Sequence, residues 1–192
     1  GSADIEYWIT FQVSSPLASS IDIVDIGFPN KHYNLASVKA DIDGVPLTDI
    51  KKSEVIEIGV EIRLHSLTIT NRSTLHVEAN QPYMIYEDSE ESDMASCVFG
   101  NTWWGSAYTL GTTNLTTRII FPTTVDSTTY TKYHYSDLPD LTYTLDDGRV
   151  VFEWNEPAAS PSRQYKYGVS FPKEGVNWIT SLPLTGEEIF LI

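Results

Sequence analysis

The sequence predicts an all-β protein whose strands form an antiparallel β-sandwich. Hydrophobic and polar residues alternate with a period of two in many short segments, which is the pattern of a strand with one buried face. Turn residues separate these segments about every ten positions, a spacing typical of antiparallel sandwiches. The spacing of an amphipathic helix is nearly absent, so helical folds are disfavoured.

Two segments carry the alternation most clearly. The first places Ile5, Tyr7, Ile9, Phe11 and Val13 on one face and Glu6, Trp8, Thr10 and Gln12 on the other. The second runs from Ile56 to Leu64. Further strands are expected at residues 21–28, 67–69, 75–79, 83–86, 95–99, 115–121, 129–135, 141–145, 150–154, 164–171 and 176–180.

Two turns predict hairpins. Asp147 and Gly148 lie between two expected strands, and an Asp-Gly pair suits the positive φ angles of a tight primed turn. The second hairpin is expected to turn at Asn71-Arg72-Ser73. A three-residue loop there would place Ile69 opposite Leu75 and Leu67 opposite Val77, with all four side chains on one face.

A Phe-Pro pair recurs three times at expected strand ends, as Phe28-Pro29, Phe121-Pro122 and Phe171-Pro172. Proline cannot donate to a sheet ladder, so each pair predicts a core aromatic followed by the end of a strand. The repetition favours two tandem immunoglobulin-like sandwich halves over one composite sandwich. The acidic run at residues 87–93 is too charged for a core and predicts the boundary between an N-terminal domain (3–88) and a C-terminal domain (94–192).

Composition excludes several classes of protein. The 26 acidic residues outnumber the 12 basic residues and give a formal charge of −14, which disfavours nucleic acid and anionic lipid as partners. The single cysteine, Cys97, excludes an internal disulfide framework, and its apolar neighbours predict a buried thiol. No apolar run reaches the length of a membrane-spanning helix, and Gly1-Ser2 is interpreted as a cloning remnant.

The segment from Phe99 to Tyr108 is the most distinctive of the chain. Adjacent tryptophans in a strand point to opposite faces, so at most one of Trp103 and Trp104 can serve the core. An exposed indole, with Tyr108 nearby, could stack on a sugar ring or anchor a protein partner. The alternative is that both tryptophans are buried between the two halves.

Two sites match the acceptor pattern for N-glycosylation, Asn71-Arg72-Ser73 and Asn114-Leu115-Thr116. Both are expected on surface loops, where a glycan could be attached. The alternative reading of Asn71 is that it simply tolerates a left-handed turn.

No motif predicts a catalytic residue, a bound metal or a cofactor. Asp41, Asp43 and Asp49 could offer oxygen ligands, but they do not fit a calcium loop and are better explained as an Asp-Gly turn. The four histidines are scattered without zinc-binding spacing. Glu153 and Glu156 are the weak candidates for acid/base chemistry on sugars.

The C-terminal residues raise two further hypotheses. Leu182-Pro183-Leu184-Thr185-Gly186 resembles the sorting signal of wall-anchored bacterial surface proteins, although the apolar stretch and basic tail typical of that family do not follow. The segment Glu188 to Ile192 is apolar enough to require burial, within the molecule or by self-association as an added strand. A removed membrane anchor is the remaining alternative.

These observations predict a noncatalytic extracellular or cell-surface β-sandwich module. It would be the ectodomain of an anchored protein or a subunit of a surface assembly, acting by binding or structure, with an unidentified protein or glycan as its ligand. The alternatives are a carbohydrate-binding module that uses Trp103, Trp104 and Tyr108, and a secreted glycoside hydrolase.

Overall fold

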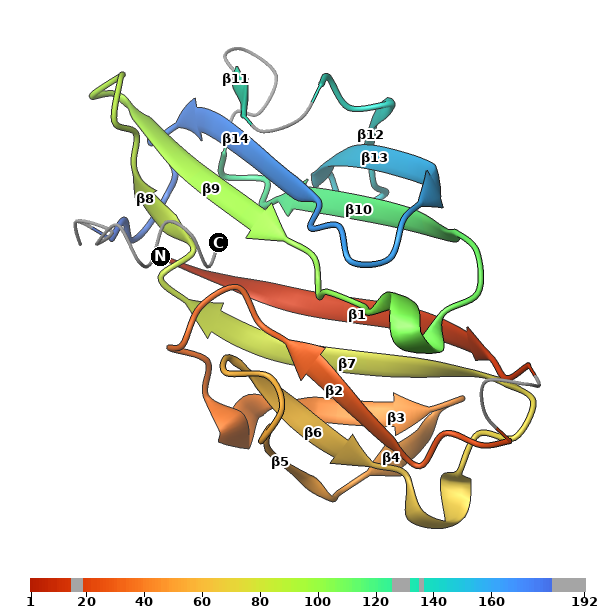
Figure 1. Cartoon of the computed structure of the whole chain (residues 1–192). Coiled ribbons are helices and arrows are strands. Elements are labelled where there is room, and N and C mark those ends of the chain that lie inside the picture. The colour runs from red at the N-terminus through yellow and green to blue at the C-terminus, as the bar shows by residue number, and fades with distance from the viewer. Residues whose placement is uncertain (15–18, 126–131, 135–136, 181–192) are drawn as a thin grey trace.

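The structure is a computed structural model that describes residues 1–14, 19–125, 132–134 and 137–180. Strands account for 52% of the described residues and helical turns for 5%. Fourteen strands pair in an antiparallel manner to form four sheets, and three short 3₁₀ turns complete the described elements (Figure 1). The prediction of an all-β antiparallel protein is therefore confirmed.

The N-terminal part of the chain forms two sheets that share one hydrophobic cluster. The first sheet has the order β1 (Ser2–Gln12), β7 (Arg72–Pro82), β3 (Lys39–Ile42) and β4 (Val45–Leu47). The second has the order β2 (Ile23–Gly27), β6 (Gly59–Arg63) and β5 (Ile50–Lys52). Their buried side chains lie between Ile5 and Ala79 in the sequence, and Val60, Ile62, Leu75 and Val77 are fully inaccessible.

The C-terminal part forms two more sheets with a cluster of their own. One has the order β10 (Thr113–Phe121), β13 (Val150–Ala159) and β12 (Leu141–Thr144). The other has the order β11 (Lys132–His134), β14 (Lys166–Pro172), β9 (Met94–Gly100) and β8 (Ile85–Glu87). Their buried side chains lie between Met84 and Phe171 in the sequence.

The two clusters meet beside β1. Phe99 packs against both of them, and its ring lies 6.2 Å from that of Tyr7 between centroids. The amide of Gly27 donates to the hydroxyl of Thr102 at 3.0 Å, which joins β2 to the segment after β9. The upper and lower groups of strands in Figure 1 are therefore connected by packing and by a hydrogen bond.

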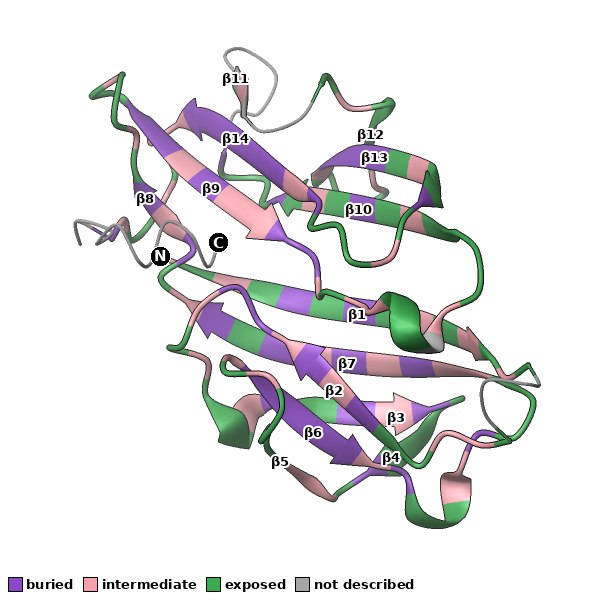
Figure 2. Cartoon of the chain, in the orientation of Figure 1, coloured by how far each residue is buried: buried purple, intermediate pink, exposed green. Residues whose placement is uncertain are grey.

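The first strand shows the predicted alternation. β1 pairs with β7 from Ser2 opposite Pro82 to Gln12 opposite Arg72. Ile5 and Tyr7 are buried, whereas Glu6, Trp8, Thr10 and Gln12 are exposed, so β1 changes between buried and exposed colours along its length (Figure 2). Because β7 alternates in the same register, the two strands present one common outer face.

The hairpin predicted at Asn71-Arg72-Ser73 is wrong. Leu75 pairs with Ile9, while Ile69 bridges Ile21 at the edge of the other sheet. Leu67 belongs to η2 (His65–Leu67), a turn that begins at His65 with φ 47°. The chain thus leaves the β6 sheet before β7 starts, and the long β1 strand takes the place beside β7 that a local hairpin would have occupied.

The Asp-Gly turns differ from expectation in detail. The hairpin between β12 and β13 is confirmed, but only Gly148 has a positive φ, 87°, so the loop is not a primed turn. Asp43 and Gly44, with φ of 50° and 83°, form the primed turn instead, between β3 and β4. The predicted strand 56–64 is shortened to β6, and the segment 176–180 contributes only a bridge from Thr180 to Tyr86.

The Phe-Pro pattern has the predicted structural meaning. Phe28, Phe121 and Phe171 are all buried, and each following proline lies at or just beyond the end of a strand. The acidic run 87–93 joins β8 to β9, whose paired residues include Glu87 and Ala95. The run is thus the turn of a hairpin within one sheet.

Asp88 organises this acidic turn. Its carboxylate accepts from the hydroxyls of Ser96 and Ser170 at 2.5 Å each and from the amides of Glu90 and Glu91. Partial burial raises the pKa of Asp88, but these hydrogen bonds outweigh it and hold the pKa below its usual range.

Residues 181–192 lie outside the described residues, and with them the motif at residues 182–186 and the strand predicted from Glu188 to Ile192. Across the described part of the chain, no helix has the length and apolar character needed to span a bilayer.

Candidate functional site

The two tryptophans of the 99–108 segment occupy different environments. Trp103 is 55% exposed, whereas Trp104 is partly buried and stacks on Tyr165 with ring centroids 6.3 Å apart and planes at 10°. The Trp104 Nε1 is buried without a hydrogen-bond partner. The backbone of Tyr108 belongs to η3 (Ser106–Tyr108), but its side chain is outside the described part of the structure. Trp103 and Trp104 therefore form no common platform, and only Trp103 can offer a largely open ring.

Both predicted glycosylation sites are accessible. Asn71 lies exposed just before β7, where its Oδ1 accepts from the Gln12 side chain at 3.2 Å. Asn114 lies exposed in β10 at an irregularity of the pairing with β13. Asn71 lies in a surface bend, although not on a hairpin tip, whereas Asn114 lies within a strand and not in the predicted loop. Modification of either remains a prediction.

The Glu153 and Glu156 pair does not form an acid/base site. Glu153 is 7% exposed, accepts from Arg118 Nε at 2.6 Å and from Asn155 Nδ2 at 3.0 Å, and these bonds lower its pKa. A general acid needs a raised pKa, so this carboxylate is better suited to an ion pair. Glu156 is three residues further along β13, where strand alternation directs its side chain to the opposite face.

The other candidate groups have structural roles. Burial raises the pKa of Cys97 to about 12, which leaves no thiolate at neutral pH. Asp41 Oδ1 accepts from the Gly44 amide at 2.8 Å, and Asp49 lies 2.6 Å from His65. No three His, Cys, Asp or Glu side chains in the described ranges are grouped so that they could hold a metal ion.

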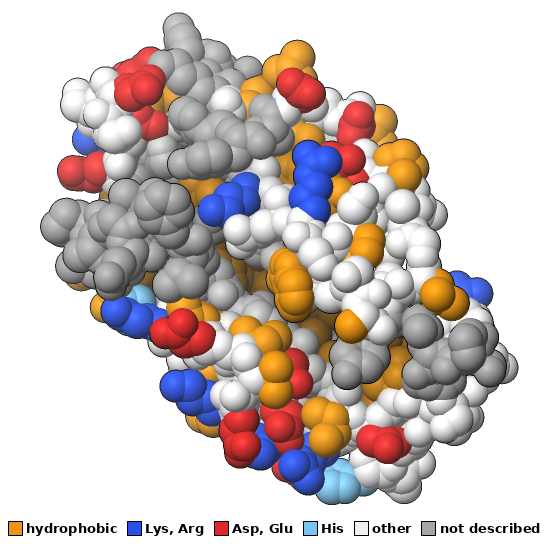
Figure 3. Space-filling model, in the orientation of Figure 1, with side chains coloured by type: hydrophobic (Ala, Val, Ile, Leu, Met, Phe, Trp, Pro, Cys, Tyr) orange, Lys and Arg blue, Asp and Glu red, His pale blue; other side chains and the backbone are white. Residues whose placement is uncertain are grey.

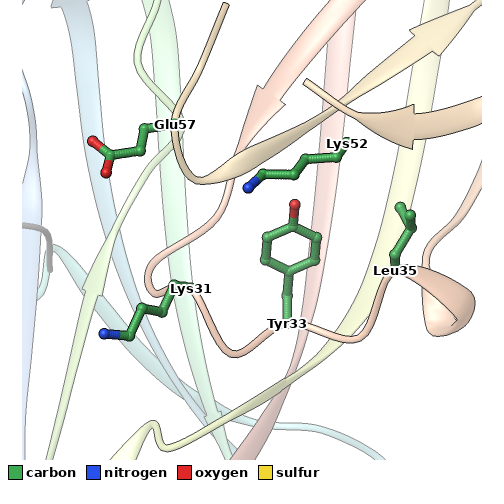
Figure 4. Close-up of a pocket in the computed structure, with 5 residues that line it drawn as sticks. All are labelled: Lys31, Tyr33, Leu35, Lys52 and Glu57. Atoms are coloured by element: carbon green, nitrogen blue, oxygen red, sulfur yellow. The ribbon is translucent and has the colours of Figure 1, made fainter. Parts of the chain in front are cut away.

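A shallow hollow lies beside β5 and the loop that follows β2. Its volume is about 210 Å³, and it is lined by Lys31, Tyr33, Leu35, Lys52 and Glu57 (Figure 4). The hydroxyl of Tyr33 donates to the carbonyl of Gly59 at 2.8 Å, and this bond fixes the Tyr33 ring in the wall of the hollow. Small-molecule sites are usually larger, roughly 300–1,000 Å³, so this hollow is a weak candidate for a ligand site.

The outer face of β1, β7 and β3 is a stronger candidate, which we call the Trp8 face. It consists of the outward side chains of three neighbouring strands: Asp4, Glu6, Trp8, Thr10 and Gln12 of β1, Arg72, Thr74, His76, Glu78 and Asn80 of β7, and Lys39 and Asp41 of β3. The register places Trp8, His76 and Asp41 in one row across the strands.

The Trp8 ring has neighbours that fix its orientation although it is 66% exposed. Its indole stacks on the imidazole of His76 with centroids 3.9 Å apart and planes at 16°, and its Nε1 donates to Glu6 at 3.4 Å. His76 is in turn fixed by Asp41, whose Oδ2 lies 3.0 Å from Nδ1. One side of the indole therefore lies on the imidazole, and the other side accounts for the large exposure.

The side chains around Trp8 are polar and mostly paired across strands. Thr10 and Thr74 share a hydrogen bond of 2.9 Å, Asn80 donates to Asp4 at 2.8 Å, and Lys39 forms an ion pair with Glu78 at 2.5 Å. These contacts run along most of the face. The rotamers are therefore fixed before any ligand arrives, which lowers the entropic cost of binding.

Sequence reasoning did not select Trp8, although the signal was present. In the alternating pattern of the first strand, Trp8 is the one large aromatic residue in the polar phase. Such a residue either meets another layer or lies on the surface, and only the neighbouring strands decide between these outcomes.

Exposed hydrophobic side chains also occur elsewhere. In the view of Figure 3, several gather near the middle of the molecule, between the two groups of strands. Leu138, Leu141, Tyr143 and Ile120 form a further set near β12, with exposed fractions from 37% to 73%. None of these is stacked and hydrogen-bonded in the way that Trp8 is.

Comparison with known proteins found no match to this chain among family models, curated proteins or solved structures.

Proposed function

We propose that this chain is a noncatalytic β-sandwich module of an extracellular or cell-surface protein, and that it binds its ligand through the Trp8 face. In this proposal the four sheets form two tandem immunoglobulin-like halves. The first half ends near Ala79 and the second begins near Met84, because buried residues change from one hydrophobic cluster to the other between them.

The observation that carries the proposal is the fixed exposure of Trp8. Burying a large side chain stabilises a protein by about 1.5–3 kcal/mol, so a surface indole forgoes stability that a buried one would provide. Here the indole is nevertheless oriented, by the His76 ring stacked on one of its sides and by Glu6, which accepts from its Nε1. A rigid aromatic surface with an open side is well suited to binding because little conformational freedom is lost.

Two further observations support a binding role over turnover. The carboxylate of Glu153 forms an ion pair with Arg118, and the thiol of Cys97 is buried. The acidic charge and the exposed acceptor sites at Asn71 and Asn114 suit a module that faces the extracellular medium.

Binding measurements on matched tryptophan variants test this proposal. The wild-type protein and Trp8→Ala would be compared by biolayer interferometry on immobilised polysaccharides, glycoproteins and matrix proteins. Trp178→Ala is the control because Trp178 is also highly exposed, at 75%, but is not one of the residues that form the Trp8 face; its backbone lies beside Gly1, before β1 begins. We expect a ligand that the wild type and Trp178→Ala retain and that Trp8→Ala loses. Equal binding by Trp8→Ala, or hydrolysis of the retained polysaccharide, would contradict the proposal.

A further inference from the structure

We infer that the ligand of the Trp8 face is an uncharged glycan, with one sugar ring stacked on the open side of the Trp8 indole. This inference rests on the proposed binding function and names the class of its ligand. It follows from three properties of the face: the open aromatic surface, the polar groups around it and the sign of its charge.

The open side of Trp8 is complementary to a sugar ring. A pyranose has one side lined by C–H groups, which are weakly positive, and the face of an indole is negative and apolar. His76 occupies one side of the Trp8 ring, so a single sugar can stack on the other. The imidazole and Glu6 hold the ring in place, and the sugar therefore meets a surface whose orientation is already set.

Hydrogen-bonding groups lie on both sides of the ring. Side chains on one face of a strand recur roughly every 7 Å, and neighbouring strands lie about 4.8 Å apart, so these groups surround Trp8 at the scale of one sugar. Thr10 and Glu6 flank it along β1, and Thr74 and Glu78 are their opposite residues on β7. Hydroxyls donate and accept, and carboxylates accept, which matches the hydroxyl groups of a sugar.

The same surroundings disfavour a protein as the partner. The central part of a protein interface is about 65% apolar, and its strongest contacts are sheltered by a ring of packed neighbours. On the Trp8 face the side chains around Trp8 are polar or charged, and the two prolines in the same outward phase, Pro82 of β7 and Pro46 of β4, lie at its margins. One aromatic ring within a polar surface provides stacking for a single ring and hydrogen bonds around it, which is what a polyhydroxyl ligand requires.

Charge selects among glycans. The face carries four acidic residues, Asp4, Glu6, Asp41 and Glu78, against the two basic residues Lys39 and Arg72. The whole chain has a formal charge of −14. Sulfated, sialylated and uronic-acid glycans would be repelled by the excess of acidic residues on the face and by the negative charge of the whole chain. The ligand is therefore expected to be neutral.

Affinity gel electrophoresis with soluble polysaccharides tests the inference. The neutral probes are dextran, mannan, galactan, xylan and a mixed-linkage β-glucan, and the anionic probes are heparin, alginate and polygalacturonate. We expect at least one neutral probe to retard the wild type and no anionic probe to bind better. Trp8→Ala should raise the dissociation constant at least tenfold, Trp8→Phe less, and Trp178→Ala not at all.

Thr10→Ala provides a second variant, since it removes a hydroxyl of the face and leaves the indole in place. It should weaken binding about two- to tenfold, equivalent to the loss of one hydrogen bond. Thermal melts show that each variant is folded. Binding of a neutral glycan that survives Trp8→Ala, preference for an anionic glycan, or failure of every neutral probe would overturn the inference.

The two proposals fail in different ways. A protein ligand that is lost with Trp8→Ala would refute the glycan inference and leave the binding face intact. A glycan bound equally by the wild type and Trp8→Ala, and lost with Trp103→Ala, would refute both proposals and return the site to the segment predicted from the sequence.

Discussion

Gly59 is predicted to be the position in the N-terminal core where one added methyl group does the most damage. Gly59 pairs with Gly27 between β6 and β2, and it is buried. A Cβ at this position would lie 2.4 Å from the carbonyl oxygen of Ile26 and 3.1 Å from its carbonyl carbon. These are backbone atoms in a paired strand, so they cannot yield without disturbing the β2–β6 pairing.

The expected cost of Gly59→Ala follows from overpacking. Inserting a methylene into a well-packed core costs about 1–3 kcal/mol, and the Gly59 carbonyl also accepts from Tyr33 and Ser53, which would shift with it. For a chain of this size each 1 kcal/mol lowers the melting temperature by about 2–4 °C. We therefore expect a decrease of roughly 2–12 °C, measured by thermal melts followed by circular dichroism.

Gly27→Ala is the matched control. Gly27 is the partner of Gly59, but a Cβ there would first meet Thr102 Oγ1 at 3.5 Å, which is an ordinary contact. Its melting temperature should stay within about 2 °C of the wild type, because surface and compatible substitutions usually change stability by under 0.5 kcal/mol. Equal destabilisation by the two variants would show that the Ile26 carbonyl is not the obstacle at Gly59.

Three further predictions concern single side chains. Glu153→Gln should lower the free energy of unfolding at pH 7 by about 1–3 kcal/mol through loss of the Arg118 ion pair. Because the folded-state pKa of Glu153 is lowered, this deficit should be complete above the unfolded value of about 4.3 and shrink as pH falls below it, as urea titrations at pH 7 and pH 3 can show. Asp88→Ala should cost about 2–4 kcal/mol, since four donors lose their acceptor, whereas exposed Asp146→Ala should not change the urea midpoint. Cys97 should react with a thiol reagent only as fast as the protein opens, so a rate in the folded protein equal to that in urea would contradict its burial.

Local rules predicted the features that depend on one strand at a time. The alternation from Ile5 to Val13 specified which side of β1 is buried, and the three Phe-Pro pairs marked core aromatics at strand ends. Both results follow from the geometry of a single strand, in which successive side chains point to opposite faces and proline cannot donate.

Pairing between distant strands could not be predicted in this way. The expected hairpin at Asn71 used the nearest apolar segment as the partner of Leu75, but Ile9 of β1 occupies that position. The short strands β3, β4 and β5 were missed, although strands of similar length such as β8 and β12 were predicted. Their pairing depends on burial against the rest of the core, as the tertiary context outweighs local propensity.

The candidate site shows the same limit most clearly. From the sequence, Trp8 could have been covered by another layer, and Trp103 could have been the exposed ring of a pair with Trp104. The register decides the first case, because it places His76 beside Trp8 and Asp41 beside His76, so that three residues far apart in the sequence form one row. The second case is decided outside the strands, where Trp103 is exposed and Trp104 stacks on Tyr165. An indole stacked on a fixed imidazole is a property of that row and of no single segment. The binding face is therefore a product of the β1–β7–β3 pairing, and a substitution that shifts the β1 register by one residue would turn Trp8 toward the core and remove the platform altogether.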